Sequence, residues 1–281
     1  MSGFELAEVF GIPIEDKTAE SHKTRQRHEC PFVAGKICTK VSKPNPLGVC
    51  SIVGGEEQDG AIAIVCPTRL YEGGLALEDA AKFFFPGESR VRALSEIPLH
   101  DAEQGRAGRI DWVLVALDDG GEVADFGSLE AQSVYISGNL RTTFEAYMAN
   151  PSRYSGPEAM FRPDYLSSTR KRLAPQLSYK GEILAHWEKK FAVAVHDAFF
   201  DQLPKFKSVD PKVANFVWLI YTLQRGSPTG RYRLARCHPV YTSFESVQEV
   251  FLMPSIGEER EFRHALTEEL RKPRRSIPLL L

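Results

Sequence analysis

The spacing of apolar and polar residues changes along the chain, and these changes predict where its helices, strands and loops lie. Residues 1 to about 75 hold few helical repeats and several turn formers, such as Lys43-Pro44-Asn45-Pro46 and Gly54-Gly55. From Ala76 the spacing predicts two short helices, Ala76 to Phe85 and Glu88 to Ile97, separated by Pro86-Gly87. We therefore expect a small loop-rich module at residues 1–75 and a larger domain at residues 76–281.

The middle of the chain is typical of a β-hairpin. Ile110 to Leu117 is an apolar, partly β-branched run, Asp118 to Gly121 is a turn, and Glu122 to Ile136 returns as a second strand. Helical spacing and an Asp-Pro start predict two later helices, and short apolar runs predict two late strands. These elements are expected at Leu177 to Leu203, Asp210 to Leu223, Arg231 to Ala235 and Val247 to Met253. The mixture predicts an α/β fold.

Composition narrows the class of protein. With 281 residues, 43% of them hydrophobic, the chain is long enough for one large globular domain or a domain with a small appended module. It has no apolar run that could span a bilayer, and its start, MSGFELAEVFGIPIEDK, lacks the pattern of a signal peptide. We therefore expect a soluble, cytoplasmic protein with no membrane partner.

Charge does not by itself indicate a nucleic-acid partner, because the formal net charge is −2. Two local stretches are basic, residues 22 to 43 and residues 162 to 190. Either could be an ordinary solvated face. Within and beyond them, Arg170-Lys171-Arg172 and the tail Arg271-Lys272-Pro273-Arg274-Arg275 are candidates for contacts with phosphate, with solvated surface as the alternative.

Four of the five cysteines cluster in the first module: Cys30, Cys38, Cys50 and Cys66. They are separated by 7, 11 and 15 residues, so no CxxC pair is present and spacing alone leaves unrelated buried thiols as an alternative. Cys30 and Cys66 precede prolines, which places them at turns where thiols can converge. Four thiolates would saturate a structural Zn²⁺ or iron, so any chemistry must lie elsewhere. Cys237 is read as a buried core thiol.

The predicted hairpin carries the candidate catalytic acids. If the turn closes at Asp118 to Gly121, Leu117 faces Glu122 and Asp111 faces Ser128, so Glu130 and Gln132 lie on the face of the sheet that carries Asp111. An acid diagonal to an acid-x-polar triplet is the arrangement of PD-(D/E)xK nucleases, although here the triplet ends in Gln132 instead of lysine. The alternative is that Asp111 caps a strand and that Glu130 and Gln132 face solvent.

Together, these motifs resemble the NotI-type restriction endonucleases. The ordered set is Phe10-Gly11, Cys30-Pro31-Phe32, Gly48-Val49-Cys50, Val65-Cys66-Pro67-Thr68-Arg69, Ile110-Asp111-Trp112 and Leu129-Glu130-Ala131-Gln132. The likeness covers about residues 5 to 137 and continues more faintly to residues 177 to 203. This chain is shorter than NotI, and pieces missing from it include segments that could read bases.

The resemblance implies a fold, a site and cofactors. It implies a PD-(D/E)xK core, with a central mixed sheet flanked by helices, and an N-terminal module in which Cys30, Cys38, Cys50 and Cys66 hold a structural iron, with zinc as the alternative. It implies catalytic roles for Asp111, Glu130 and Gln132, glutamine being the family's residue in the lysine place. A further acid maps onto Glu96, at the end of the predicted helix Glu88 to Ile97.

The resulting hypothesis is a type II restriction endonuclease, a homodimer that cuts double-stranded DNA at a GC-rich palindrome. Asp111 and Glu130, helped by Glu96 and a main-chain carbonyl near residue 131, would hold Mg²⁺ against the scissile phosphate. Gln132 would position water or phosphate by hydrogen bonds. The main alternative is a non-catalytic DNA-binding protein with a structural four-cysteine metal site. A redox or iron-sulfur protein is a third reading, which would require visible cluster absorption.

Overall fold

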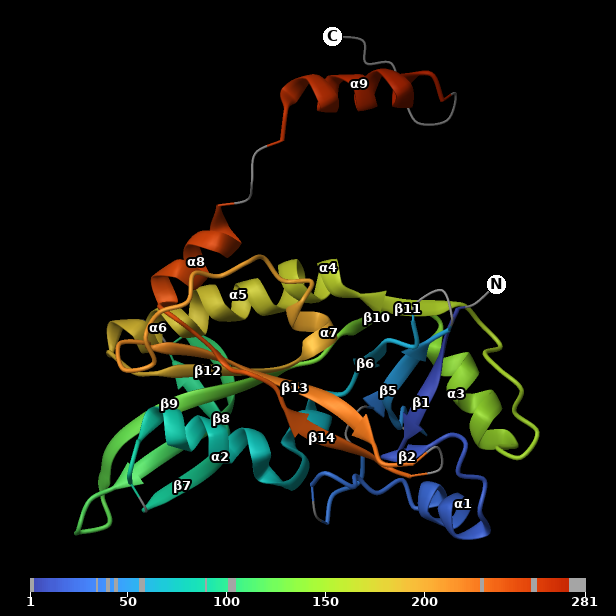
Figure 1. Cartoon of the computed structure of the whole chain (residues 1–281), viewed down its shortest axis with the longest axis horizontal. Coiled ribbons are helices and arrows are strands. Elements are labelled where there is room, and N and C mark those ends of the chain that lie inside the picture. Colours follow the sequence, from blue (N-terminus) through green and yellow to red (C-terminus); the bar gives the residue numbers. More distant parts are fainter. Residues whose placement is uncertain are drawn as a thin grey trace.

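A mixed β-sheet forms the centre of the molecule (Figure 1), in a computed structural model that describes residues 3–33, 35–38, 41–42, 45–55, 59–88, 90–100, 105–227, 230–253 and 257–272. The strand order is β14-β13-β12-β9-β8-β7, and β15 also pairs with β13. Strands β9, β12 and β13 run parallel, whereas β7, β8, β14 and β15 pair antiparallel. The strands are β7 (Val91–His100), β8 (Arg106–Leu117), β9 (Val123–Gln132), β12 (Phe191–His196), β13 (Phe216–Arg225), β14 (Tyr232–Arg236) and β15 (Val240–Thr242).

Helices cover both faces of this sheet. On one face, η2 (Pro67–Gly74) and α2 (Leu75–Phe84) pack over Leu114, Leu129 and Ala194. On the other face, a helical run from Tyr165 to His186 packs over Val113, Val193 and their neighbours. That run is made of α4 (Tyr165–Ser168), η3 (Thr169–Leu173), α5 (Ala174–Gln176), η4 (Leu177–Gly181) and α6 (Glu182–His186), and α7 (Asp197–Phe200) and α8 (Phe244–Leu252) lie on the same side. The predicted mixed sheet flanked by helices is confirmed.

The N-terminal part has a sheet of its own, in the order β2-β1-β5-β6. The elements here are β1 (Phe4–Val9), β2 (Ile12–Pro13), α1 (Ala19–Gln26), β3 (Val41–Ser42), β4 (Asn45–Pro46), β5 (Val49–Gly54) and β6 (Ile62–Ile64). Its apolar residues pack with β10 (Tyr135–Gly138), α3 (Leu140–Ala149) and β11 (Phe161–Asp164), through side chains such as Phe144 and Tyr147. The cysteine region is thus seated on an ordered sheet whose core includes residues from the middle of the chain.

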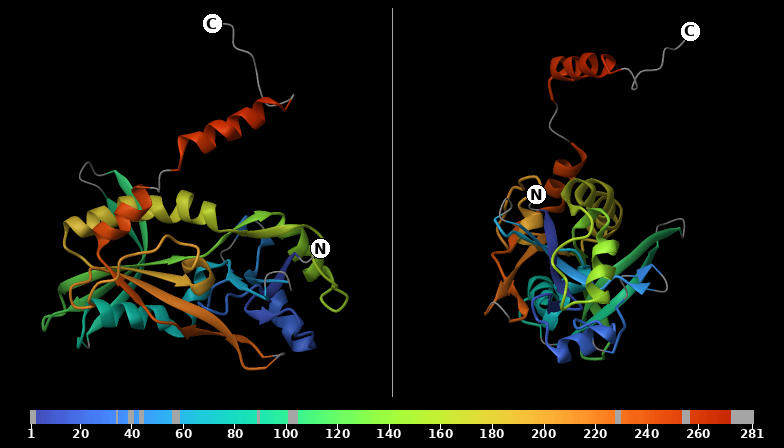
Figure 2. Two further views of the ribbon diagram at one scale, coloured as in Figure 1. Left: turned by 45° about the horizontal axis from the view of Figure 1, so that its top comes forward. Right: turned by 90° about the vertical axis from the view of Figure 1, so that its right-hand side faces the viewer.

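The last helix, α9 (Glu259–Leu270), stands away from the body of the molecule in both further views (Figure 2). Its apolar side chains Phe262, Leu266 and Leu270 are exposed, at helical spacing. Within the described residues, none of the helices is long and apolar enough to span a bilayer.

Several predicted elements are confirmed and others are wrong. The helix predicted from Ala76 is α2, the hairpin is β8 and β9, and the strand at Arg231 is β14. Glu88 to Ile97 is not a helix, because Val91–His100 pairs along its length with β8. The predicted helix from Leu177 ends at His186, and Phe191–His196 is a strand buried on both faces. Such strands are continuous apolar runs, which periodicity cannot distinguish from a buried helix.

The same ambiguity explains the two remaining errors. Residues 216–223, predicted as the second half of a helix, belong to strand β13, in which most side chains are buried. Residues 247–252, predicted as a strand, belong to α8, which begins where the Ser243 hydroxyl accepts a hydrogen bond from Ser246 N at 3.2 Å. That N-cap is a sequence signal of a helix start.

Candidate active site

The predicted acids come together at one place on the central sheet. Val113 pairs with Ser128 and Trp112 with Leu129, so Asp111 falls opposite Glu130. The predicted pair of Asp111 with Ser128 is therefore wrong by two residues, and the predicted pair of Leu117 with Glu122 is wrong by one, because Leu117 pairs with Val123. A bulge between Ala116 and Leu117 accompanies the shift. Because side chains alternate with a period of two, a shift of two residues keeps Asp111, Glu130 and Gln132 on the same face.

Glu96 joins this group from β7 rather than from a helix. Ser95 pairs with Trp112 and Ile97 with Ile110, which leaves Glu96 opposite Asp111. Its backbone φ is 58°, in the left-handed region that a residue other than glycine rarely adopts. Strained backbone of this kind gathers at functional sites. The row Glu96, Asp111, Glu130 thus crosses three neighbouring strands, and it is called the acid row below.

Asp111 is held by two hydrogen bonds. Its Oδ2 accepts one from the main-chain N of Ala131 at 3.0 Å and one from the Tyr71 hydroxyl at 3.3 Å. The bond to Ala131 agrees with the alternative that Asp111 caps a strand. Both bonds use Oδ2, so with respect to the residues that the structure describes, Oδ1 can take a further ligand. Burial, followed by the charges of Asp111, Glu130 and Glu96, raises the pKa of the Tyr71 hydroxyl well above its ordinary value. Tyr71 is therefore close enough to all three acids to be affected by their charges.

Glu130 and Gln132 are buried, at 3% and 7% exposure, so the alternative that they face solvent is wrong. Burial and the neighbouring Asp111 charge raise the pKa of Glu130 to about 7, although the Lys180 ammonium acts in the opposite direction. Lys180 donates to Glu130 Oε1 at 2.8 Å from the helical turn η4. Gln132 turns its amide to its own chain, because Nε2 donates to Ser133 O at 2.6 Å.

A cavity of about 770 Å³ opens beside the acid row. Of the acid row, Asp111 lines this cavity, together with Ala131 and Gln132. The basic residues Arg141, Lys171 and Arg172 line it as well and are called its basic wall below. The Arg172 guanidinium also lies over the Tyr135 ring, 4.7 Å from its centroid. An acid row next to a basic wall can bind a divalent cation and a phosphate group together.

Two residues of the site were missed by sequence reasoning, Tyr71 and Lys180. They lie 40 residues before Asp111 and 50 residues after Glu130, and each comes from an element outside the hairpin. A single tyrosine or lysine in a helical segment carries no signal of such a contact. Of the basic candidates, Lys171 and Arg172 line the cavity, and Arg271 and Lys272 follow α9 at its far end. Residues 273–275 of the predicted tail lie outside the described residues.

The basic stretch at residues 22 to 43 is less available than its composition indicates. The Arg25 side chain is buried, and its Nη2 donates to Pro13 O at 2.7 Å. Lys40 and Lys43 lie outside the described residues.

The cysteines gather at one end of the N-terminal sheet. Cys30 N donates to Lys36 O at 2.8 Å and Cys38 N to His28 O at 2.8 Å, so both cysteines lie on one small loop. Cys66 N donates to Cys50 O at 3.3 Å, which joins the other two. Burial and the charges of Cys66, Glu8 and Cys38 raise the pKa of the Cys50 thiol well above its ordinary value. These shared charges indicate that three of the thiols are close neighbours.

Neither group is arranged as a closed set of metal ligands. Within the part of the chain that the structure describes, no three His, Cys, Asp or Glu side chains meet at distances for holding an ion. The donor sets nevertheless fit the implied metals: clustered thiols suit zinc or iron, and paired carboxylates beside a carbonyl suit magnesium.

Buried Arg69 connects the cysteine region to the central sheet. Its Nε lies 3.1 Å from Glu8 Oε2 and its Nη1 lies 2.7 Å from Glu72 Oε2. A third bond runs from Nη2 to Tyr232 O at 3.1 Å, and the guanidinium covers the Phe32 ring at 4.5 Å. One buried cation therefore joins the cysteine region to η2 and to strand β14 of the central sheet.

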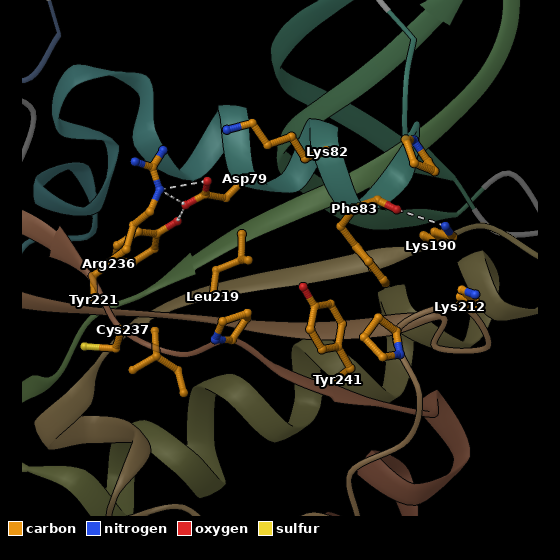
Figure 3. Close-up of a pocket in the computed structure, with 14 residues that line it drawn as sticks. Asp79, Lys82, Phe83, Lys190, Lys212, Leu219, Tyr221, Arg236, Cys237 and Tyr241 are labelled. Carbon is orange, nitrogen blue, oxygen red and sulfur yellow. Dashed lines mark hydrogen bonds and ion pairs between the residues drawn. The ribbon is translucent and has the colours of Figure 1, made fainter.

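A second cavity, of about 490 Å³, lies on the α2 side of the sheet (Figure 3). Several of its polar groups are paired with one another: Asp79 accepts from Tyr221 at 2.9 Å and from Arg236 at 2.8 Å, and Lys190 donates to Phe83 O at 2.9 Å. It lacks the acids of the acid row, so the chemistry is assigned to the first cavity.

Comparison with known families identifies the family of this chain. The model of the family described as "Restriction endonuclease NotI" matches residues 8–234, which include the four clustered cysteines and the whole acid row. Comparison with curated proteins gives no significant match. Because the match spans most of the 281 residues, the chain belongs to the NotI restriction endonuclease family, whose members are type II enzymes that cut DNA.

Proposed function

We propose that this restriction endonuclease cuts double-stranded DNA at one specific palindromic, GC-rich site by Mg²⁺-dependent hydrolysis of the phosphodiester. The observation that carries the proposal is the acid row beside the basic cavity wall. The preference for GC-rich DNA rests on the family resemblance alone. The PD-(D/E)xK assignment rests on the strand order around Asp111 and Glu130 and on the triplet that ends in Gln132.

In this proposal, Asp111 and Glu130 hold Mg²⁺, with Glu96 and the main-chain carbonyl of Ala131 as further oxygen ligands. When bound, the metal lowers the pKa of a water molecule and stabilises charge on the phosphate. Tyr71 and the Ala131 N–H fix the Asp111 carboxylate through the bonds at 3.3 and 3.0 Å, which keeps its free oxygen aimed. Gln132 orients water or phosphate by hydrogen bonding, because an amide cannot carry charge.

Recognition of a palindrome requires a two-fold arrangement, so the proposed assembly is a homodimer. Light scattering on the purified protein would then give twice the 31.5 kDa chain mass, and a monomer mass with DNA bound would contradict this. Lys171 and Arg172 would contact phosphates on the cavity wall, and Cys30, Cys38, Cys50 and Cys66 would hold a structural iron or zinc in a module of residues 1–75. The catalytic domain would comprise residues 76–281.

Asp111→Asn tests the proposal directly. The asparagine keeps the shape and can still accept from Ala131 N, so the fold is retained while one anionic ligand is lost. Cleavage of a plasmid of known sequence with Mg²⁺ is expected to fall by at least ~10³-fold, which corresponds to about 4 kcal/mol of lost transition-state stabilisation. Specific binding, measured by gel shift with Ca²⁺, is expected to persist, and the mapped ends of wild-type fragments define the site.

Asp119→Asn is the matched control, because Asp119 lies in the hairpin turn with a fully exposed side chain. It is expected to cleave like the wild type. If Asp111→Asn also cleaves like the wild type, the site is elsewhere. If the wild type binds a specific sequence and never cuts it, the chain is a non-catalytic DNA-binding protein.

A further inference from the structure

Among the described residues, the acid row has a basic partner that the motif does not supply, the ammonium of Lys180. Its Nζ lies 2.8 Å from Glu130 Oε1, and both side chains are nearly buried, at 9% and 3% exposure. Among the residues that the structure describes, this is the one ion pair between a basic side chain and an acid of the row. Because moving either side chain would leave the other as an unpaired buried charge, the pair holds both charges in place.

Gln132 cannot supply that charge. The usual motif ends in lysine, whereas this side chain is neutral and its amide already donates to Ser133 O at 2.6 Å. Lys180 is on the same side of the sheet as Glu130, since residues 177 and 184 of its helical run pack against Val193, the partner of Glu130 on β12. A cation is therefore present where the motif lacks one, but it comes from a helix instead of from β9.

The backbone around Lys180 holds it in place. Lys180 belongs to the π-helical turn η4, and turns of this kind are rare and frequently occur at functional sites. The next residue, Gly181, lies so close to the Phe244 ring that an added Cβ would overlap it. A Cβ on Gly108, at the start of β8, would lie 3.5 Å from Lys180 Cε. The Phe244 contact thus fixes the backbone next to Lys180, and Gly108 borders the side chain whose ammonium reaches Glu130.

We propose that Lys180 takes the place of the motif lysine, and that its ammonium contacts the scissile phosphate or the attacking water beside Glu130. This inference rests on the proposed function. It makes Lys180 a catalytic residue and limits Gln132 to a hydrogen-bonding role.

The test removes the positive charge at position 180 and then restores one at position 132. Lys180→Met is expected to lower the single-turnover rate of DNA cleavage by about 100-fold, because one fixed charge at the reacting centre is lost. The double variant Lys180→Met with Gln132→Lys, which returns a cation to the same face and gives Glu130 a partner, is expected to recover at least tenfold of that loss. Lys189→Met is the matched control, because Lys189 pairs with another β9 acid, Asp125, at 2.7 Å.

Two readouts separate a catalytic role from a structural one. The DNA affinity of Lys180→Met with Ca²⁺ is expected to stay within about threefold of wild type. Its affinity for Ca²⁺ alone, measured by calorimetry at pH 8, is expected to rise, because a positive neighbour of the ion is removed.

Opposite results overturn the inference in distinguishable ways. If Lys180→Met cuts at the wild-type rate, or if the double variant folds and recovers nothing, Lys180 does not take the place of the motif lysine. If Ca²⁺ affinity falls and the thermal midpoint collapses with the rate, Lys180 is only a structural partner of Glu130. If the wild type cuts no DNA at all, the proposed function itself fails.

Discussion

At the residue scale, the proposed chemistry depends on a carboxyl group whose pKa is raised by burial. Glu130 is buried beside Asp111, which raises its pKa to about 7 from an ordinary value of 4.5. A carboxyl group must lose its proton before it can bind a metal ion. In the proposed mechanism, protons and Mg²⁺ would therefore compete for Glu130 in the physiological pH range.

The cleavage rate is accordingly expected to rise as pH increases from 6 to 8 and to level off above that. The sign follows from the raised pKa, since the metal-binding form of Glu130 is the minority below about 7. Raising the Mg²⁺ concentration should move this rise in rate to lower pH. Single-turnover cleavage rates measured across the pH range at two Mg²⁺ concentrations check the shift. If the midpoint of the rise does not depend on the Mg²⁺ concentration, the pH dependence comes from a group other than Glu130.

The raised pKa also has a consequence for folding. For a carboxyl group of this kind, stability is greatest below the unfolded pKa and is lost as pH rises through the folded pKa, because the fold disfavours the charge. The metal-free protein therefore loses this contribution between about pH 4.5 and 7. Bound Mg²⁺ would offset the loss, which couples occupancy of the site to stability.

At the element scale, the site is built where three β-strands and two helical segments meet. Alternation within β8 and β9 predicts that Asp111, Glu130 and Gln132 share a face, and the two-residue error in register does not change that. Glu96 could be assigned from the family likeness, but its strand could not be predicted. β7 is an edge strand with most of its side chains exposed, so it lacks the alternation that identifies a half-buried strand.

What could not be predicted from the sequence are the contacts between distant elements. Lys180 and Tyr71 reach the acid row from η4 and η2, and only the packing of these segments on opposite faces of the sheet brings them there. The strands β12 and β13 escaped prediction because they are buried on both faces. Local patterns therefore identify the hairpin that carries the acids, but not the groups that set their charge.

Substitution of Arg69 tests how strongly its buried ion pairs hold neighbouring elements together. Arg69→Met would leave the buried Glu8 carboxylate without its cation and would remove the links to Glu72 and Tyr232. Breaking a buried ion pair on one side typically costs about 3–5 kcal/mol, so the free energy of unfolding in urea is expected to fall by that amount. Arg263→Met is the control, because Arg263 pairs with Glu259 on the surface of α9. Equal stabilities of the two variants would refute the assigned role of Arg69.

At the scale of the whole molecule, the cysteine region and the sheet that carries the acids share packing. Ala7 and Ile64 belong to the same apolar cluster as Leu114 and Leu129, and Arg69 adds a polar link. A structural metal in the cysteine region would therefore stabilise the position of the catalytic sheet without taking part in the reaction.

Cys50→Ser is expected to remove the bound metal and to lower the thermal midpoint. The physical reason is that a hydroxyl does not replace a thiolate as a ligand for zinc or iron. Metal content by mass spectrometry, normalised to protein, gives the measurement and also decides between iron and zinc. Cys237→Ser is the matched control, since Cys237 is half-buried, not fully buried as predicted, and packs against an apolar cluster that contains none of the other four cysteines. An equal metal content in the wild type and in Cys50→Ser would contradict the four-cysteine assignment.

The most direct test of the central claim locates the ion. Crystals of the protein with its uncut DNA site would be soaked in Mn²⁺, and anomalous scattering would be measured at the manganese absorption edge. We predict a peak between the carboxylates of Asp111 and Glu130, within ~2.5 Å of an oxygen of each and facing a DNA phosphate. A strong peak elsewhere, with none between these two carboxylates, would contradict the account.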